Sequence, residues 1–166
     1  GASTRSVVAH DPLGRSISTH YATSGDMAII EMAQVSGVAL LEAQERNPML
    51  TSSYGLGEVM LDALDRGARH MILGIGGSAT NDCGMGMLEA LGYRFYDAEG
   101  EVLTSSGEAM CHVVRIDVAN VDARLSECEI VVASDVDNVL YGERGAAWVY
   151  AKQKGATPVM IDALDR

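Results

Sequence analysis

The feature that most constrains the fold is a glycine-rich segment between an apolar run and a helical pattern. Residues 71–73 are Met-Ile-Leu, residues 74–82 read GIGGSATND, and residues 84–91 read GMGMLEAL. This order predicts a strand, a glycine-rich turn and a helix. Such a turn exposes backbone N–H groups and places a helix N-terminus behind them, which favours an anion. Candidate ligand-binding residues in the turn are Gly76, Gly77, Ser78, Thr80 and Asn81, and Asp82 adds a carboxylate.

A purely structural interpretation of this segment stays open. Glycines after a strand often serve only a tight turn and close helix packing. Asp82 alternatively is an N-cap, because a carboxylate there satisfies free helix donors. The segment is neither a Walker A loop nor a strict G-x-G-x-x-G fingerprint, because neither pattern occurs in residues 74–92.

The rest of the pattern predicts an α/β fold. Strands are expected at 5–10, 16–23 and 27–33, and they form an antiparallel meander. Helix and strand then alternate from residue 53 to residue 97, which indicates parallel pairing. We therefore predict one domain over residues 1–166, with a mixed sheet flanked by helices. The later elements are expected at 54–66 (helix), 69–74 (strand), 82–91 (helix), 92–97 and 111–118 (strands), 129–134 (a buried strand) and 157–166 (helix).

A second loop with hydroxyl groups and glycines precedes the helix expected at 54–66. Residues 51–58 read TSSYGLGE, and Ser52 and Ser53 are candidates for binding an anion. The alternative is a capping box, in which a Ser or Thr and a Glu cap the helix. Both loops lie beside the strand at 69–74, so they can converge on one ligand.

A pair of carboxylates follows the last apolar strand. Asp135 and Asp137 lie in the segment SDVDN and point to the same side if the segment is extended. Carboxylates at the carboxyl end of a strand often lie where ligands bind in open α/β sheets, and they suit Mg²⁺. The alternative is an Asp- and Asn-rich turn that needs no metal.

The charge of the chain restricts its partners. The formal net charge is −11 and the isoelectric point is about 4.6, which disfavours nucleic acid. An anionic substrate therefore needs local donors, Mg²⁺ or basic residues from elsewhere. Lys152 and Lys154 are the only lysines, and both are candidates to meet phosphate, although a solvated surface pair is the usual role of lysines.

Cysteine usage and hydropathy favour a cytoplasmic protein. Cys83, Cys111 and Cys128 are widely spaced without a C-x-x-C, so we expect reduced thiols rather than a disulfide framework or a zinc site. A thiol at Cys83, near a helix N-terminus, can have a lowered pKa, but we do not expect it to be catalytic. No apolar run approaches the ~18 residues of a membrane span, so no membrane partner is expected.

Six segments of the chain, taken in order, match the pattern of a known family. They are HDPLGR (10–15), AIIEMAQVSGVALL (28–41), NPMLTSSYGLGE (47–58), GIGGSATNDCGMGMLEALG (74–92), ASDVDNVLYGERGAAWVY (133–150) and KQKGAT (152–157). Together they resemble the ATP-dependent glycerate kinases of the two-lobed bacterial type, and the resemblance covers essentially the whole chain. The chain departs from the family pattern at Cys83, where glycine is usual, and at Lys152 and Val139, where proline is usual.

The resemblance implies a reaction and roles. ATP, with Mg²⁺, phosphorylates D-glycerate, and the 2-hydroxyl is the expected acceptor, giving 2-phosphoglycerate. The residues implied to bind substrate or phosphate are the candidates named above in the two loops, together with Lys154. Lys154 matches the family pattern at its position, whereas Lys152 does not. Asp82 is the candidate base or orienting group, and Asp135 with Asp137 are the candidate ligands of a metal or its water, with Asp135 also counted as catalytic.

The resemblance also implies that the chain is the inserted lobe of a longer enzyme. Family members are roughly twice as long, and their two α/β lobes enclose the active site. On its own the chain is then expected to be inactive. One alternative is a non-catalytic ligand-binding lobe that needs the missing lobe for activity, and another is a structural or oligomerising module.

Overall fold

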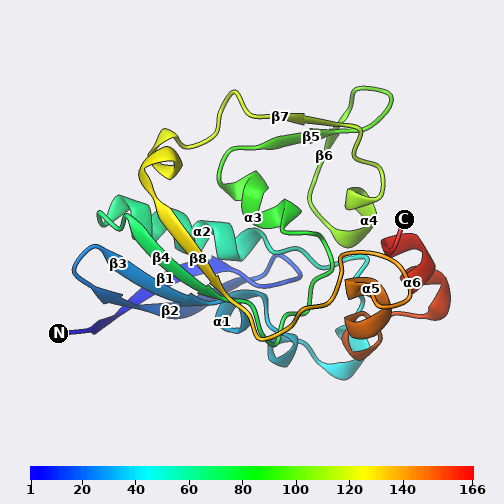
Figure 1. Cartoon of the computed structure of the whole chain (residues 1–166), viewed down its shortest axis with the longest axis horizontal. Coiled ribbons are helices and arrows are strands. Elements are labelled where there is room, and N and C mark those ends of the chain that lie inside the picture. Colours follow the sequence, from blue (N-terminus) through cyan, green and yellow to red (C-terminus); the bar gives the residue numbers. More distant parts are fainter.

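The computed structural model describes all residues, 1–166, and its centre is a five-stranded mixed sheet (Figure 1). The first three strands form the predicted antiparallel meander. The third, fourth and fifth strands of the sheet are parallel, so the predicted mixed sheet is confirmed. In spatial order the strands are β1 (Ser3–His10), β2 (Ser16–Ser24), β3 (Met27–Glu31), β4 (His70–Gly74) and β8 (Glu129–Ala133).

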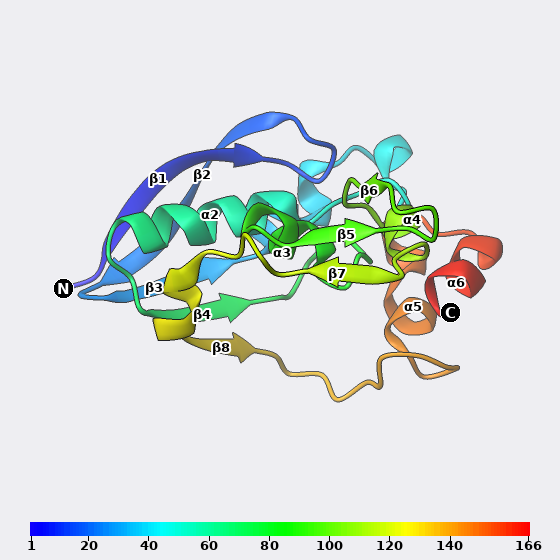
Figure 2. The ribbon, with the colours of Figure 1, turned by 90° about the horizontal axis from the view of Figure 1, so that it is seen from above.

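Four of these strands run in the same direction. Because β2 is antiparallel to both of its neighbours, β1 is parallel to β3, β4 and β8. Figure 2 shows their arrowheads pointing toward the end of the molecule where α5 and α6 lie. The carboxyl ends His10, Glu31, Gly74 and Ala133 therefore share one edge of the sheet, and open α/β sheets bind ligands at such an edge.

Helix α2 (Tyr54–Asp65) covers one face of the sheet and confirms the helix predicted at 54–66. Its apolar side chains recur at helical spacing and pack on alternate residues of β3 and β4. The Tyr21 hydroxyl of β2 also donates to Asp62 Oδ2 at 2.7 Å, which ties the helix to the meander. The buried residues of this contact are Leu56, Val59, Met60, Ala63 and Leu64 of α2 with Ala28, Ile30, Met71 and Leu73 of the sheet.

Helix α3 (Met85–Ala90) packs on α2 and is shorter than the predicted span 82–91. Gly84 has a φ of 74° and Cys83 a φ of 48°, and this left-handed backbone excludes both from the helix. The helix approaches α2 closely at Gly57, where a Cβ would lie 2.4 Å from the carbonyl oxygen of Met87.

A small antiparallel sheet lies over α3. It contains β6 (Val102–Leu103), β5 (Arg94–Tyr96) and β7 (Arg115–Asp117), so the strands predicted at 92–97 and 111–118 exist in shorter form. The segment between β6 and β7 contains the short helix α4 (Gly107–Met110). Its first turn is capped by the Ser106 hydroxyl, which accepts from Ala109 N at 3.0 Å.

The C-terminal helices form a separate apolar cluster at the carboxyl edge. Helix α6 (Pro158–Leu164) confirms the helix expected at 157–166 and packs on α5 (Ala146–Tyr150). The remaining short elements are α1 (Ala33–Ser36), η1 (Val38–Leu40), η2 (Ala43–Glu45), η3 (Ala123–Glu127) and η4 (Lys152–Lys154).

Strand β8 corrects the expectation of a buried strand at 129–134. Ile130, Val131 and Val132 are 40%, 49% and 52% exposed. The reason is position: β8 is the last strand of the sheet, and the core beneath α2 is completed by β1 to β4 without it. Its apolar sequence is typical of a parallel strand with cover on both faces, which this chain does not provide. None of the helices is long and apolar enough to span a membrane.

We predict that Gly57→Ala destabilises the chain and that Gly76→Ala does not. Alanine usually stabilises a helix interior relative to glycine, but at residue 57 its Cβ collides with the backbone of α3. The expected cost is about 1–3 kcal/mol in the free energy of unfolding. A Cβ at Gly76 has no atom within 4 Å, so that variant should change the free energy by less than about 0.5 kcal/mol. Denaturant unfolding followed by circular dichroism compares the two, and equal stability of both variants would contradict the close α2–α3 contact.

Candidate functional site

The two glycine- and hydroxyl-containing loops meet at the carboxyl edge of the sheet. Thr51 Oγ1 donates to the carbonyl oxygen of Ala79 at 3.0 Å. Ser53 donates both its backbone N–H and its hydroxyl to Asp82 Oδ2, each at 2.8 Å. The structure therefore brings the segments 51–53 and 76–82 together, as their shared neighbour β4 suggested.

The carboxylate of Asp82 holds this junction. It is 1% exposed, and it also accepts from the N–H groups of Gly84 at 3.2 Å and Gly86 at 3.1 Å. Ser53 Oγ in turn accepts from Met87 N at 3.0 Å. These amides are the N-terminal donors of α3, so this helix end is occupied by the chain itself and does not face a ligand. The geometry gives Asp82 an orienting position with both of its oxygen atoms engaged.

The free donors of the turn lie earlier, at residues 76–78. The backbone N–H groups of Gly76, Gly77 and Ser78 donate no hydrogen bond within the chain. The turn is nevertheless fixed, because Val38 N donates to Gly77 O at 2.9 Å and Ala79 N donates to Ser36 O at 2.8 Å. Gly77 has a φ of 70°, a conformation that glycine adopts without strain. Three successive N–H groups on this fixed turn are therefore left for an acceptor outside the chain.

A cavity of about 800 Å³ adjoins the turn. The side chains of Ser78, Thr80 and Asn81 line it, together with Val132 of β8 and Tyr141 beyond it. No hydrogen bond engages these three polar side chains, and Asn81 Oδ1 is buried without a partner. Unpaired polar groups around a cavity are available to a ligand.

Lys154 reaches the turn from η4. Its Nζ donates to the carbonyl oxygen of Thr80, and the residue is 7% exposed. Burial lowers the pKa of Lys154 to about 8, while the nearby Asp82 carboxylate opposes that shift in part. Lys154 thus lies at the site, and the exposed Lys152 remains on the surface.

Asp135 and Asp137 follow β8 at the same edge as the turn, but they join no cluster. Both are exposed, and no group of three or more Asp, Glu, His or Cys residues is arranged to hold a metal ion. Mg²⁺ in phosphoryl-transfer sites is held by one or two carboxylates together with phosphates and water. Two free carboxylates fit that kind of binding and do not fit a cage made of protein ligands alone.

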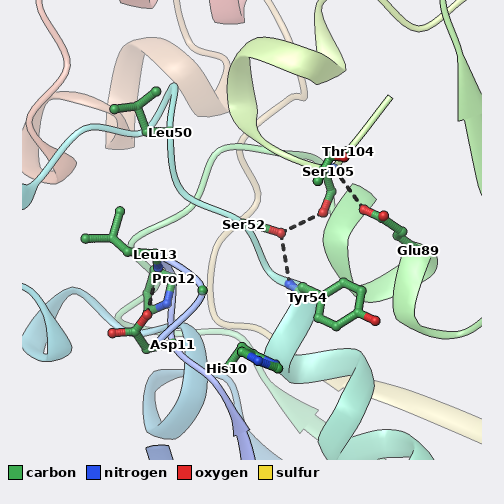
Figure 3. A pocket seen from close by; sticks show the side chains of 11 residues that line it. His10, Asp11, Pro12, Leu13, Leu50, Ser52, Tyr54, Glu89, Thr104 and Ser105 are labelled. Atoms are coloured by element: carbon green, nitrogen blue, oxygen red, sulfur yellow. Dashed lines mark hydrogen bonds between the residues drawn. The ribbon is translucent and has the colours of Figure 1, made fainter. Parts of the chain in front are cut away.

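Ser52 faces away from the turn. Its hydroxyl shares a hydrogen bond of 2.8 Å with Ser105 Oγ and accepts from Tyr54 N at 3.1 Å. Ser52 lines a second cavity of about 430 Å³ (Figure 3). The capping-box alternative for this loop is wrong, because Glu58 instead binds His10, through the backbone N–H at 2.7 Å and through Nδ1 at 2.8 Å.

Sequence reasoning missed Ser105 and Glu89, which line this second cavity. Glu89 Oε2 accepts from Ser105 N at 2.8 Å. No local motif marks either residue, since the contact joins α3 to a loop that lies 16 residues further along the chain.

The pKa of the Cys83 thiol is raised, not lowered as a nearby helix N-terminus can cause. Burial raises the pKa of Cys83, and the neighbouring Asp82 carboxylate and Cys111 add to the increase. The helix end that could have stabilised a thiolate is already capped by Asp82.

The comparisons with known proteins agree with one another. The sequence pattern of the Glycerate kinase family matches residues 1–166. "Glycerate kinase" of Halalkalibacterium halodurans is 49% identical over 156 residues, and "Glycerate 2-kinase" of Escherichia coli is 46% identical over 156 residues. A crystal structure described as glycerate kinase 2 from Salmonella typhimurium LT2 is 46% identical, with a TM-score of 0.95, over 99% of this chain and 44% of that chain.

The chain is shorter than the relatives it matches. The two sequence relatives align with 93% of this chain but only 41% of their own length. The chain therefore spans about two fifths of a curated relative.

We predict that Asp82→Asn strongly destabilises the chain. An amide offers one oxygen in place of two, so at least one buried N–H group loses its acceptor. The expected loss is about 2–4 kcal/mol in the free energy of unfolding, measured by denaturant titration. Asp135→Asn is the matched control, because that side chain is exposed and should leave stability unchanged. Equal unfolding midpoints for both variants would rule out Asp82 as the structural link.

We also predict that Lys154 makes stability increase with pH in the alkaline range. Its pKa is about 8 in the folded chain and 10.5 for an ordinary lysine. Between these values the unfolded chain binds more protons than the folded chain, so the free energy of unfolding rises with pH, by up to about 3 kcal/mol. Lys154→Met should remove this slope, and Lys152→Met should keep it. The same pH profile in all three proteins would show that Lys154 is not a buried cation.

Proposed function

Because the chain belongs to the glycerate kinase family, we propose that it is part of an enzyme that transfers the γ-phosphoryl group of ATP to D-glycerate. The observation that carries this proposal is the fixed turn with three unpaired N–H groups beside a cavity with unpaired polar side chains. We propose the 2-hydroxyl as the acceptor, in line with the name of the Escherichia coli relative, so the product is 2-phosphoglycerate.

Binding of an anion is the role we propose for the turn. The N–H groups of Gly76, Gly77 and Ser78 meet a carboxylate or phosphate oxygen, and the side chains of Thr80 and Asn81 orient the rest of the ligand. Phosphoryl transfer depends on alignment and charge stabilisation far more than on covalent chemistry. Hydrogen-bond donors that are fixed before the ligand arrives provide both the alignment and the charge stabilisation.

Asp82 and Lys154 support this site through hydrogen bonds within the chain. Of the two expected roles for Asp82, we propose the orienting one, because its oxygens already accept four hydrogen bonds from the chain. Lys154 holds the Thr80 carbonyl, and its remaining protons and charge attract an anionic ligand. Ser53 contributes through Asp82 rather than by direct contact.

Magnesium is the cofactor we propose for Asp135 and Asp137. Bound there with the phosphates of ATP, the ion would neutralise charge that develops during transfer. Strand β8, which pairs with β4 as far as Ala133 and Gly74, brings the segment with both carboxylates to the carboxyl edge of the sheet.

The rest of the enzyme must supply further basic groups. The chain has a net charge of −11 and only two lysines, while glycerate and ATP are both anionic. We propose that residues 1–166 form one ligand-binding lobe, that a second lobe closes over the cavity, and that this lobe alone is catalytically inactive. We expect the enzyme in the cytoplasm, where free thiols such as those of Cys83, Cys111 and Cys128 stay reduced.

The proposal is tested by a kinase assay with D-glycerate and MgATP on a full-length enzyme that carries this segment. ³¹P NMR should identify 2-phosphoglycerate, and Gly76→Val should lower kcat/KM at least about tenfold, because its side chain fills the space next to the free N–H groups. Ala119→Val, at an exposed site, is the control. Activity without loss in the Gly76 variant would contradict the role of the turn, and comparable turnover by residues 1–166 alone would contradict the need for a second lobe.

A further inference from the structure

The second cavity lies on the opposite side of the loop 51–54 from the glycine-rich turn. The adjacent residues Ser52 and Ser53 mark the division, because Ser53 binds Asp82 while Ser52 binds Ser105 at the cavity wall. Its volume of about 430 Å³ falls within the range of small-molecule sites. Both cavities adjoin the carboxyl edge of the sheet, since His10, the last residue of β1, lines the second one.

One wall of this cavity is polar and incompletely paired. Glu89 uses Oε2 to accept from Ser105 N, and its Oε1 has neither a hydrogen bond nor an ion pair. Thr104, next to Ser105 in the chain, also lines the cavity, and its exposed hydroxyl makes no hydrogen bond within the chain. A free carboxylate oxygen next to hydroxyl groups matches the donors of a vicinal diol.

The opposite wall carries apolar side chains beside His10 and Asp11, whose polar groups are already paired with Glu58 and Arg15. Pro12, Leu13 and Leu50 lie across the cavity from Glu89 and Thr104, and Tyr54 lines it on the side of Glu89 (Figure 3). The Tyr54 ring is held in place by an edge-to-face contact with His10, at 6.2 Å between ring centroids. Apolar and aromatic side chains on one side suit a planar, weakly polar group.

The charges around the cavity disfavour an anion. Asp11 is paired with Arg15, and Glu58 is paired with His10, but no cation pairs with Glu89. A phosphate or carboxylate in contact with Glu89 would be repelled. The cavity therefore suits the uncharged part of a ligand that has both a diol and a planar group.

We propose that this cavity binds the nucleoside of the phosphoryl donor, with the vicinal ribose hydroxyls on Glu89 and the base between Leu13, Leu50 and Tyr54. The identity of this ligand rests on the proposed kinase function. Loop 51–54 borders both cavities, so the phosphates of such a nucleotide extend along it toward the free N–H groups of residues 76–78. D-glycerate also has a vicinal diol, but it has no planar group for the apolar wall, and its carboxylate would face Glu89.

The first test uses residues 1–166 with adenosine and 2′,3′-dideoxyadenosine, followed by NMR shifts and titrated to saturation. Wild type should bind adenosine about tenfold more tightly than the dideoxy compound, with shifts at Leu13, Leu50 and Tyr54. Glu89→Gln keeps an acceptor for Ser105 N but loses the charge, and it should abolish this difference. Glu127→Gln, the same change on an exposed side chain, should retain the difference. Equal affinity of wild type for both nucleosides, or no binding of adenosine, would overturn the proposal.

The second test uses the full-length enzyme and separates the two substrates. Glu89→Gln should raise KM for ATP about tenfold and leave KM for D-glycerate within about twofold of wild type. A selective increase in KM for D-glycerate would instead assign the diol site to glycerate and overturn the proposal. Absence of kinase activity in the wild-type enzyme would refute the proposed function, while the adenosine titration would still decide whether the cavity binds a nucleoside.

Discussion

The buried carboxylate of Asp82 is the interaction on which the candidate site depends. It accepts hydrogen bonds from Ser53, the residue immediately before α2, and from Gly84 and Gly86 at the start of α3. One side chain thereby fixes two helix entries and the end of the glycine-rich turn. Because these donors are satisfied internally, the donors left for a ligand are those of residues 76–78, and their position follows from how Asp82 is held.

The sheet determines where this arrangement lies. Four strands end at the same edge, and each delivers a segment with polar side chains: the turn after β1, the segment after β3, the turn after β4 and the acidic loop after β8. Strand β2 is the only one of the five that runs the other way, and it carries no candidate residue. The loop 51–54, which leads into α2, also lies at this edge and separates the two cavities. Binding groups that are far apart in the sequence thus become neighbours through strand direction alone.

The sequence predicted the parts of the fold that are governed by local pattern. The meander, α2 and the turn after β4 follow from alternation, helical spacing and glycine placement, and all three are present. The exposure of β8 could not be predicted, because an apolar strand reads as buried whether or not a neighbour covers it. The early residues of the expected helix at 82–91 also differ, because the left-handed backbone at Cys83 and Gly84 arises from the hydrogen bonds to Asp82.

For the candidate site, the sequence predicted which segments meet, but not where their individual side chains point. The convergence of the segments 51–53 and 76–82 followed from their common neighbour β4. Ser52 and Ser53 face different cavities because their side chains point in different directions at the start of α2. The residue types alone do not reveal these directions. The free oxygen of Glu89 depends on a contact with Ser105 across 16 residues of chain. Contacts between residues so far apart in the sequence can be identified only from the three-dimensional structure.

The most direct measurement is the backbone amide spectrum of residues 1–166 during titration with D-glycerate. The account predicts that the resonances of Gly76, Gly77 and Ser78 shift most, because their N–H groups are unpaired and already fixed. The amides of Gly84 and Gly86, which are bound to Asp82, should move little. Large shifts at Gly84 and Gly86 with no change at residues 76–78 would show that the ligand displaces the carboxylate, and would contradict the account.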